Sequence, residues 1–390
     1  MVPLYIPAIV SVLVEQQSTF ETAFQIISAG NVRDDRGALA VLGTVPVDKT
    51  VIFRSSGTKM IWYFRANPSA NVTLKFTNTS LVPSPVALIG SSGWVAVALQ
   101  VPDGTGTRWV ASVEGNAVGS GEFEVFLQPE ACKVQPNIPK GQLIKLDKID
   151  SKVYPAIDRG IWVYVPANYS SSKPASLMVF QDGQSAKNYI PTVLDNMIDK
   201  REVPQIITIF LEPGTAANGR SNRSVEYDTL SATYSNYLIN EVLPVVNARW
   251  PFKTGPEFHA IAGISSGAIC AFTVAWERPD MFQKVLSWVG SYVNLQGGAT
   301  GIGGGHNYPT LIRKTRGKPK PIRVFLQDGT NDLDNPYGNW PLANMEMDKA
   351  LSYSGYDYKF VLGQGFHSEN HGRALLPESL RWLWRGVSID

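Results

Sequence analysis

A serine placed between two glycines is the residue of this sequence best suited to covalent chemistry. The run Gly263-Ile264-Ser265-Ser266-Gly267 follows a short apolar segment, 258–262, and precedes small and apolar residues that begin at Ala268. A serine on a strained strand-to-helix turn needs neighbours almost without side chains two positions before and after it, and the two glycines meet that demand. The pattern predicts that Ser265 is a nucleophile and that the main-chain N–H of Ser266 is one of the donors of an oxyanion hole.

A serine nucleophile needs a base that takes its proton. The chain has four histidines, and two of them, His367 and His371, follow the last predicted strand, 357–362. We expect His367 to be the base because it comes sooner after the strand, and His371 is the alternative. His259 begins the strand before the serine, where a structural role is expected.

The base in turn needs an acid that orients it, and three aspartates compete for this role. Asp328, Asp332 and Asp334 follow the predicted strand 322–327. We expect Asp332 to be the acid, because it lies just past the turn; Asp334 is the main alternative, and Asp328 is expected to cap the turn. Aspartate is common in turns, so each of the three also has a purely structural interpretation.

An oxyanion hole requires two N–H donors. Beside Ser266, we expect the second from Gln184, in the loop after the predicted strand 175–181, where a glycine lets the main chain turn toward a substrate carbonyl. Further residues are predicted to shape a substrate pocket, although each also fits ordinary packing: Gly183, Arg223, Glu226, His306, Tyr308 and Trp340.

The distribution of predicted elements divides the chain into two domains. Residues 1–132 carry short β-branched and aromatic runs separated by turns, which predicts an all-β, immunoglobulin-like sandwich. A Pro-bearing linker follows over 133–145. Residues 146–390 alternate strands with helices, which predicts a mostly parallel sheet covered on both faces, the α/β-hydrolase arrangement. The polar segment 30–47 is either a lid over the site or a surface loop.

Composition narrows the classes of partner. The 390 residues are 44% hydrophobic and 17% charged with a net charge of +2, which fits a globular protein and argues against nucleic-acid or membrane-surface binding. No metal or organic cofactor is expected, and no disulfide between the two cysteines. No apolar run is long enough for a transmembrane helix. The compartment is predicted as cytoplasmic, or periplasmic or secreted if a leader has been removed.

From about residue 140 onward the chain resembles the enterochelin-esterase-like branch of α/β-hydrolase serine esterases, which adjoins the esterase D group. The segments that carry the resemblance are Asp182-Gly-Gln, Asn222-Arg-Ser-Val-Glu-Tyr, Gly263-Ile-Ser-Ser-Gly, Arg278-Pro-Asp-Met-Phe with the later Val-Gly-Ser-Tyr, Phe325-Leu-Gln-Asp-Gly-Thr-Asn-Asp-Leu-Asp-Asn and Gly365-Phe-His. The resemblance implies a β-sandwich ahead of the hydrolase domain and supports Ser265 and His367. The chain departs from siderophore esterases after the histidine, where Ser368-Glu-Asn-His replaces their Gly-x-His-Asp/Ser-Trp pattern, and this argues against a siderophore substrate.

Together these features predict a serine carboxylesterase that cleaves a small-molecule carboxylic ester through an acyl-enzyme. The resemblance implies bulky aryl or xenobiotic esters among the substrates. A siderophore esterase, a peptidase or acyltransferase with the same residues, and a non-catalytic binding protein on the same scaffold are the alternatives. The first domain is expected to cover the active site or to form a homodimer surface.

Overall fold

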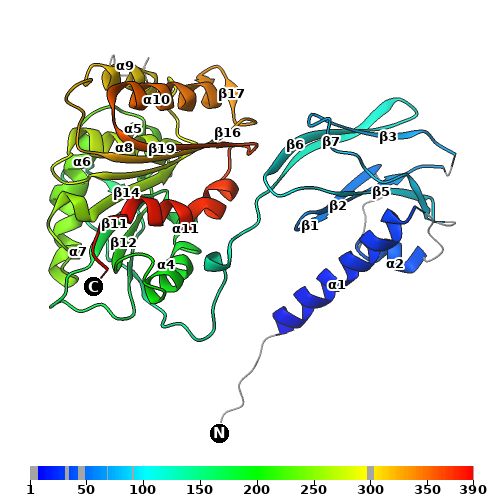
Figure 1. The fold of residues 1–390 in the computed structure, drawn as a ribbon, viewed down its shortest axis with the longest axis horizontal. Coiled ribbons are helices and arrows are strands. Elements are labelled where there is room, and N and C mark those ends of the chain that lie inside the picture. The colour runs from blue at the N-terminus through cyan, green and yellow to red at the C-terminus, as the bar shows by residue number, and fades with distance from the viewer. Residues whose placement is uncertain are drawn as a thin grey trace, which may run out of the picture. The chain divides into compact units, whose positions relative to one another are not determined.

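The structure, a computed structural model, describes residues 8–30, 35–42, 49–67, 69–89, 92–296 and 303–389. The chain divides into two compact units, Met1–Leu127 and Gln128–Asp390 (Figure 1). Of the segment 30–47, expected to be either a lid or a surface loop, residues 31–34 and 43–47 lie outside the described residues. Residues 297–302, in the glycine-rich loop before His306, lie outside them as well.

The first unit contains two antiparallel sheets. One has the strand order β1 (Val51–Ser56), β2 (Lys59–Arg65), β5 (Trp94–Gln100), β4 (Ala87–Ile89), and the other the order β3 (Val72–Phe76), β6 (Thr105–Val113), β7 (Asn116–Val125). Side chains of β2 alternate between two cores. Met60, Trp62 and Phe64 pack toward the three-stranded sheet, which makes the unit a β-sandwich, as predicted.

The opposite face of the four-stranded sheet is covered by helices that the sequence analysis did not predict. Helix α1 (Ala8–Ser28) packs with β2 and β5, and its buried residues are Phe20, Ala23, Phe24 and Ile27. Helix α2 (Asp35–Leu39) lies within the predicted lid segment, and the Ala38 carbonyl accepts a 2.6 Å hydrogen bond from the hydroxyl of Tyr63 on β2. The first unit is therefore all-β only from β1 onward.

The second unit contains the whole of the predicted linker 133–145, together with residues 128–132, which the sequence analysis assigned to the first domain. The short helix η1 (Glu130–Cys132) packs on α4 (Ile190–Asp199), where the Asn196 side chain donates to the carbonyls of Ala131 and Lys133 at 2.8 Å each. Strand β8 (Gln142–Lys145) pairs with β10 (Ile161–Val165). Cys132 and Cys270 are both free thiols.

An eight-stranded sheet forms the centre of the second unit. Its order is β19 (Asp357–Gly363), β16 (Arg323–Gly329), β15 (Lys284–Trp288), β14 (His259–Ile264), β11 (Ser176–Gln181), β12 (Ile206–Leu211), β10, β8. The strands from β19 to β12 run parallel to one another. Strand β10 is antiparallel to β12, and β8 is antiparallel to β10. Parallel strands carry their carboxyl ends to one edge of the sheet, where α/β folds place their ligands.

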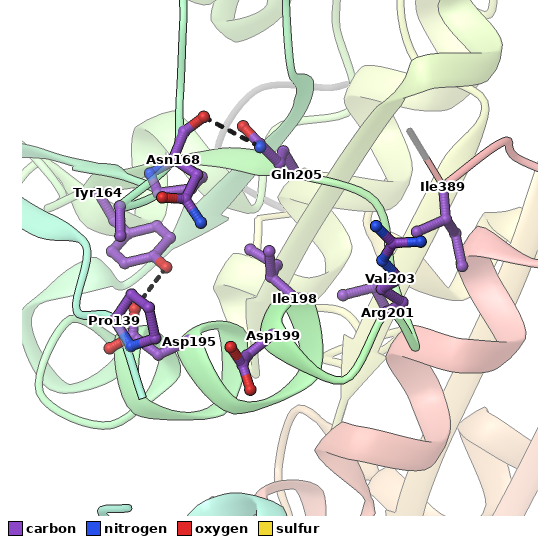
Figure 2. Close-up of a pocket in the computed structure, with 12 residues that line it drawn as sticks. Pro139, Tyr164, Asn168, Asp195, Ile198, Asp199, Arg201, Val203, Gln205 and Ile389 are labelled. Carbon is purple, nitrogen blue, oxygen red and sulfur yellow. Dashed lines mark hydrogen bonds between the residues drawn. The ribbon is translucent and has the colours of Figure 1, made fainter. Parts of the chain in front are cut away.

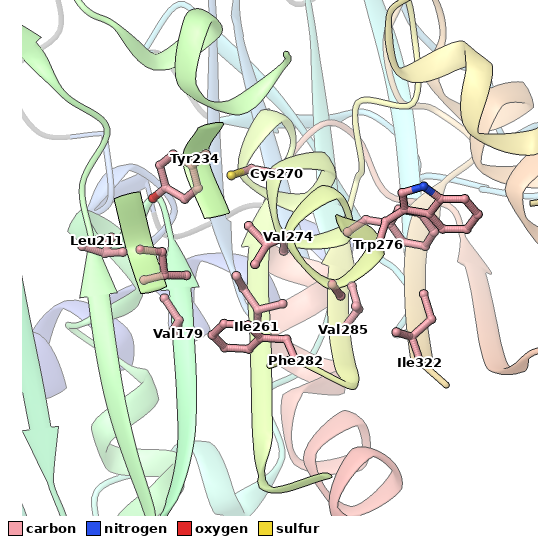
Figure 3. Close-up of a cluster of buried hydrophobic side chains, with 14 of the residues drawn as sticks. Val179, Leu211, Tyr234, Ile261, Cys270, Val274, Trp276, Phe282, Val285 and Ile322 are labelled. Atoms are coloured by element: carbon pink, nitrogen blue, oxygen red, sulfur yellow. The ribbon is translucent and has the colours of Figure 1, made fainter. Parts of the chain in front are cut away.

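Helices cover both faces of this sheet, as the alternating pattern predicted (Figure 1). One face packs on α6 (Thr233–Tyr237), α7 (Leu243–Arg249), α8 (Ser266–Glu277), α9 (Tyr308–Arg313) and α10 (Trp340–Ser354), and the other on α4 and α11 (Asn370–Trp384). Figure 3 shows how Val274 of α8 lies against Ile261 and Val285 of the strands beneath it. The apolar strand residues therefore fix the helix that follows Ser265.

None of the helices that the structure describes combines the length and apolar character needed to cross a bilayer. Within the described ranges, no group of three or more His, Cys, Asp or Glu side chains is arranged to hold a metal ion.

Candidate active site

Ser265 occupies a strained turn between β14 and α8. Its φ of 58° and ψ of −121° lie in a region that residues with a Cβ rarely adopt. A Cβ at Gly263 would lie 2.2 Å from the carbonyl oxygen of Gly267, and one at Gly267 would lie 2.6 Å from an Asp182 carboxylate oxygen. The two glycines are thus required by close packing around the turn.

Ser265, His367 and Asp332 meet at the carboxyl edge of the sheet. The Ser265 Oγ lies 2.8 Å from Nε2 of His367, and Nδ1 of the same ring lies 2.6 Å from Oδ1 of Asp332. The Asp332 side chain is fully buried, whereas that of His367 is 23% exposed. The imidazole can therefore reach a substrate while the carboxylate behind it is kept from water.

Backbone donors fix the carboxylate in this position. Oδ1 of Asp332 accepts the Leu333 N–H at 2.5 Å, and the N–H of Asp332 itself donates to the Gly329 carbonyl. An oriented carboxylate holds Nδ1–H of the imidazole, which leaves Nε2 free to accept the serine proton. The arrangement can activate Ser265 as a nucleophile.

Ser291 and Trp340 extend the hydrogen-bonded chain behind the serine. The Ser291 Oγ lies 3.1 Å from the Ser265 Oγ and accepts the Trp340 indole N–H at 3.2 Å. An indole N–H can only donate, so the Ser291 hydroxyl is free to donate to Ser265, and Ser265 can donate to His367. The Trp340 ring also packs edge-on against the His367 ring, with 5.7 Å between centroids.

Sequence reasoning did not assign Ser291 to the site. It stands three residues after β15, the strand beside β14, and follows Val289, whose φ of 44° is unusual for a β-branched residue. The Val-Gly-Ser-Tyr run was visible in the sequence, and its place after a strand next to the serine strand was the available signal.

The N–H groups of Ser266 and Gln184 both lie in the first turn of a helix, α8 and α3 (Gly183–Ala186) respectively. Within the part of the chain that the structure describes, neither has a hydrogen-bond acceptor. Such orphan N–H groups are the donors that an oxyanion hole requires.

The loop that carries Gln184 turns at Asp182, where φ is 56° and ψ is 41°, and not at the glycine. Gly183 is needed for close packing instead, because a Cβ there would lie 2.6 Å from the Cβ of Phe210. Arg223, in α5 (Arg223–Tyr227), donates through Nε and Nη2 to both Asp182 oxygens, at 2.8 and 2.7 Å. These donors of the guanidinium are thus directed at the loop and not at a pocket mouth.

The alternative acid and base, Asp334 and His371, have the following surroundings. Asp334 is an exposed residue of the short strand β17 (Asp334–Asn335). His371 is buried in α11, where its Nδ1 lies 3.1 Å from the Gln327 amide and its ring leaves no room for a side chain at Gly363.

Three predicted pocket residues lie in other surroundings. Glu226 is buried in an ion pair with Arg159, with nitrogen–oxygen distances of 2.7 and 3.0 Å, and so it does not line a pocket mouth. Tyr308 is also buried, and its hydroxyl donates to Thr273 at 2.7 Å. His306 is exposed in the short helix η4 (Gly305–Asn307).

A cavity of about 180 Å³ lies at the opposite edge of the sheet (Figure 2). Its lining includes Asn168, which follows β10, and Gln205, which precedes β12 and donates to the Asn168 carbonyl at 3.1 Å. Tyr164 on its wall donates to Asp195 at 2.8 Å. Because the cavity lies at the amino end of β12, it is separate from the Ser265 site.

Comparison with known proteins places these features in a wider context. The model of the Esterase family, described as "Putative esterase", matches residues 154–383, which include every member of the hydrogen-bonded chain from Trp340 to Asp332. The iron(III) enterobactin esterase of Escherichia coli (strain K12) is 26% identical over 217 residues, covering 54% of this chain and 51% of that protein. The enzyme of the same name from Dickeya dadantii is 24% identical over 241 residues, covering 58% and 52%. The chain thus spans about half the length of the curated relatives it matches.

Solved structures share the fold. The ferric enterobactin esterase of Salmonella typhimurium superimposes with a TM-score of 0.59 at 16% identity, over 87% of this chain and 97% of that one. The ferulic acid esterase of Anaeromyces mucronatus superimposes with a TM-score of 0.51 at 19% identity, over 65% of this chain and 94% of that one.

Proposed function

Because this chain belongs to the esterase family, we propose that it is a serine carboxylesterase that works through an acyl-enzyme, with Ser265 as nucleophile, His367 as base and Asp332 as acid. The observation that carries the proposal is the continuous hydrogen bonding from Ser265 to His367 and from His367 to Asp332, at 2.8 and 2.6 Å. These distances lie within the reach required for proton transfer to a general base.

In the first half of the reaction His367 Nε2 accepts the Ser265 proton while Oγ attacks the ester carbonyl carbon. The negative charge that develops on the carbonyl oxygen is held by the N–H groups of Ser266 and Gln184. When the tetrahedral intermediate collapses, the bond to the alcohol oxygen breaks and that oxygen takes the proton from His367.

In the second half a water molecule gives its proton to His367 and attacks the acyl carbon. The bond to Ser265 Oγ then breaks, and the serine recovers its proton from the same histidine. The sum of the two halves is ester plus water to acid plus alcohol, and the enzyme is regenerated without a redox partner.

The experiment that tests this function is labelling by a fluorophosphonate probe, combined with hydrolysis of 4-nitrophenyl butyrate. Ser265→Ala should abolish labelling and reduce kcat by about a thousandfold or more, since the nucleophile is lost. His367→Ala should cause a comparable loss, whereas His371→Ala should retain most activity at temperatures where it stays folded. Unchanged hydrolysis by Ser265→Ala would refute the proposal and favour a non-catalytic binding protein.

The substrate class proposed is a bulky aryl ester. Three large side chains are exposed on the loop that carries Asp332 and at the start of α10. They are Leu333, Tyr337, which is 54% exposed, and Leu342. An exposed apolar rim of this kind suits an aromatic acyl or alcohol group. The ferulic acid esterases among the similar structures have an aromatic acid in their name, which is consistent with this choice.

The curated relatives favour a second substrate, the siderophore ester enterobactin. A panel of ethyl ferulate, enterobactin and 4-nitrophenyl acetate separates the two substrate classes. We expect the highest kcat/KM with ethyl ferulate, and a loss of about tenfold for that substrate in Tyr337→Ser, since a buried aromatic contact contributes on the order of 1.4 kcal/mol. The acetate should be unaffected; a preference for enterobactin would assign the siderophore class instead. An amide analogue and an added alcohol acceptor test for peptidase or acyltransferase activity.

A further inference from the structure

The carboxyl group of Asp328 lies directly behind the proposed acid. Asp328 stands at the end of β16 with 0% of its surface exposed, and its Oδ1 accepts the Gly329 N–H at 2.8 Å. The N–H of Asp332 returns to the Gly329 carbonyl at 3.1 Å, so the chain folds back between the two residues and their carboxyl groups interact electrostatically.

The second oxygen of each carboxyl group is the informative one. Oδ2 of Asp328 and Oδ2 of Asp332 are both buried, and neither has a hydrogen-bond donor among the residues that the structure describes. If both groups were ionised, two negative charges would be in contact in a buried place without a cation between them. Such a pair avoids the electrostatic repulsion between two carboxylates by keeping one proton.

The neighbours of each group indicate which of them keeps the proton. Asp332 receives the Leu333 N–H and faces the His367 ring, whose Nδ1 must be a donor for the base to work, so its charged form is stabilised. Asp328 accepts the Gly329 N–H at Oδ1, and its Oδ2 has no donor among the residues that the structure describes. Burial, followed by the hydrogen bond and charge of Asp332, raises the pKa of Asp328 well above its usual range.

We propose that Asp328 is a positioning residue: a neutral carboxylic acid whose O–H donates to Oδ2 of Asp332 and holds that carboxylate against His367. The proposal rests on the proposed function, in which Asp332 and His367 are acid and base. It also gives Asp328 a role different from that of an alternative acid, because a group without charge cannot stabilise the imidazolium.

Two substitutions at position 328 separate this role from simple packing. In Asp328→Asn the amide oxygen can still accept the Gly329 N–H and the NH2 group can still donate to Oδ2 of Asp332. We expect kcat within about threefold of wild type. In Asp328→Ala the donor is lost and a buried carboxylate oxygen is left unpaired, and we expect kcat to fall by about 10- to 100-fold with KM nearly unchanged, as for the loss of a hydrogen bond to a charged group.

Asp334→Ala, an exposed position on the same loop, is the matched control and should retain wild-type kcat. Equal losses in Asp328→Asn and Asp328→Ala would overturn the proposal, because position 328 would then need a carboxyl group for another reason. Wild-type activity in Asp328→Ala would overturn it as well.

A direct measurement decides the case if Asp328→Ala does not fold. Infrared difference spectra between wild type and Asp328→Asn at neutral pH should show the C=O stretch of a protonated carboxylic acid, shifted in D2O and absent from the variant. A difference spectrum with only carboxylate bands would contradict a neutral Asp328. Failure of the proposed function is recognised separately, by hydrolysis that persists in Ser265→Ala.

Discussion

At the scale of single residues, the pair Arg223–Asp182 fixes the loop that carries Gln184, the second donor of the proposed oxyanion hole. Asp182 has a left-handed backbone conformation one residue before Gly183, and a bidentate guanidinium grips its carboxylate. One oxygen of the same carboxylate lies 2.6 Å from where a Cβ on Gly267 would stand, so the Gln184 loop packs closely against the first turn of α8. We propose that the pair in this way holds the Gln184 N–H beside that of Ser266.

We therefore expect Arg223→Lys to lower kcat by about tenfold while KM and the melting temperature change little. A lysine ammonium cannot reproduce two parallel hydrogen bonds to one carboxylate, and a small displacement of an oxyanion donor is costly in the transition state. Steady-state kinetics with 4-nitrophenyl butyrate measure the effect.

Arg278→Lys is the matched control, because Arg278 grips Asp280 through the same two atoms at 2.8 and 2.7 Å but lies at the far end of α8. Equal losses of kcat in both variants would show that the effect is not local to the oxyanion loop. A rise in KM alone for Arg223→Lys would mean that Arg223 binds substrate directly, as the sequence first suggested.

At the scale of secondary-structure elements, long periodic segments were predictable and polar or terminal ones were not. The predicted strand 175–181 appears as β11, and the strand predicted at 357–362 appears as β19, because both are set by local apolar patterns. Helix α1 was missed although Phe20, Phe24 and Ile27 recur at helical spacing, because residues 1–132 were assigned as a whole to an all-β domain. Strand β8 was missed because three of its four residues are polar or exposed and its pairing with β10 is not local.

The same difference applies to the candidate site. Ser265, Asp332 and His367 could be chosen from the sequence because each follows a strand whose carboxyl end reaches the same edge of the sheet. The contacts of Ser291 and of Asp328 depend on which side-chain oxygen faces which atom, and no spacing rule encodes that. Glu226 was misplaced for a related reason, since its partner Arg159 lies 67 residues away in the sequence.

At the scale of the whole second unit, charge is distributed unequally between the two edges of the sheet. The carboxyl edge holds the proposed acid and base, whereas the amino edge buries a lysine at the start of β15. Lys284 is only 4% exposed, its ammonium donates to the Glu257 carbonyl, and its nearest ring is that of Trp384, 5.2 Å away. Burial, with the nearby charges of Arg323 and Arg385, lowers the pKa of Lys284 to about 8.

This residue should make stability depend on pH in the alkaline range. The unfolded chain keeps the lysine proton up to its ordinary pKa of about 10.4, whereas the folded chain releases it near 8, so the unfolded state binds more protons between these values and stability rises with pH. Below pH 8 the buried charge costs about 3 kcal/mol, and this cost disappears as pH rises toward 10.4.

In Lys284→Met there is no charge to relieve, so the free energy of unfolding of wild type minus that of Lys284→Met should increase by up to about 3 kcal/mol from pH 7 to pH 10. Urea unfolding at each pH measures this difference. The control is Lys318→Met, at an exposed position, for which the difference in free energy of unfolding from wild type should stay nearly constant from pH 7 to pH 10. If the curves of wild type and Lys284→Met run parallel across this range, Lys284 is charged at the same pH in the folded and unfolded chains and its burial carries no such cost.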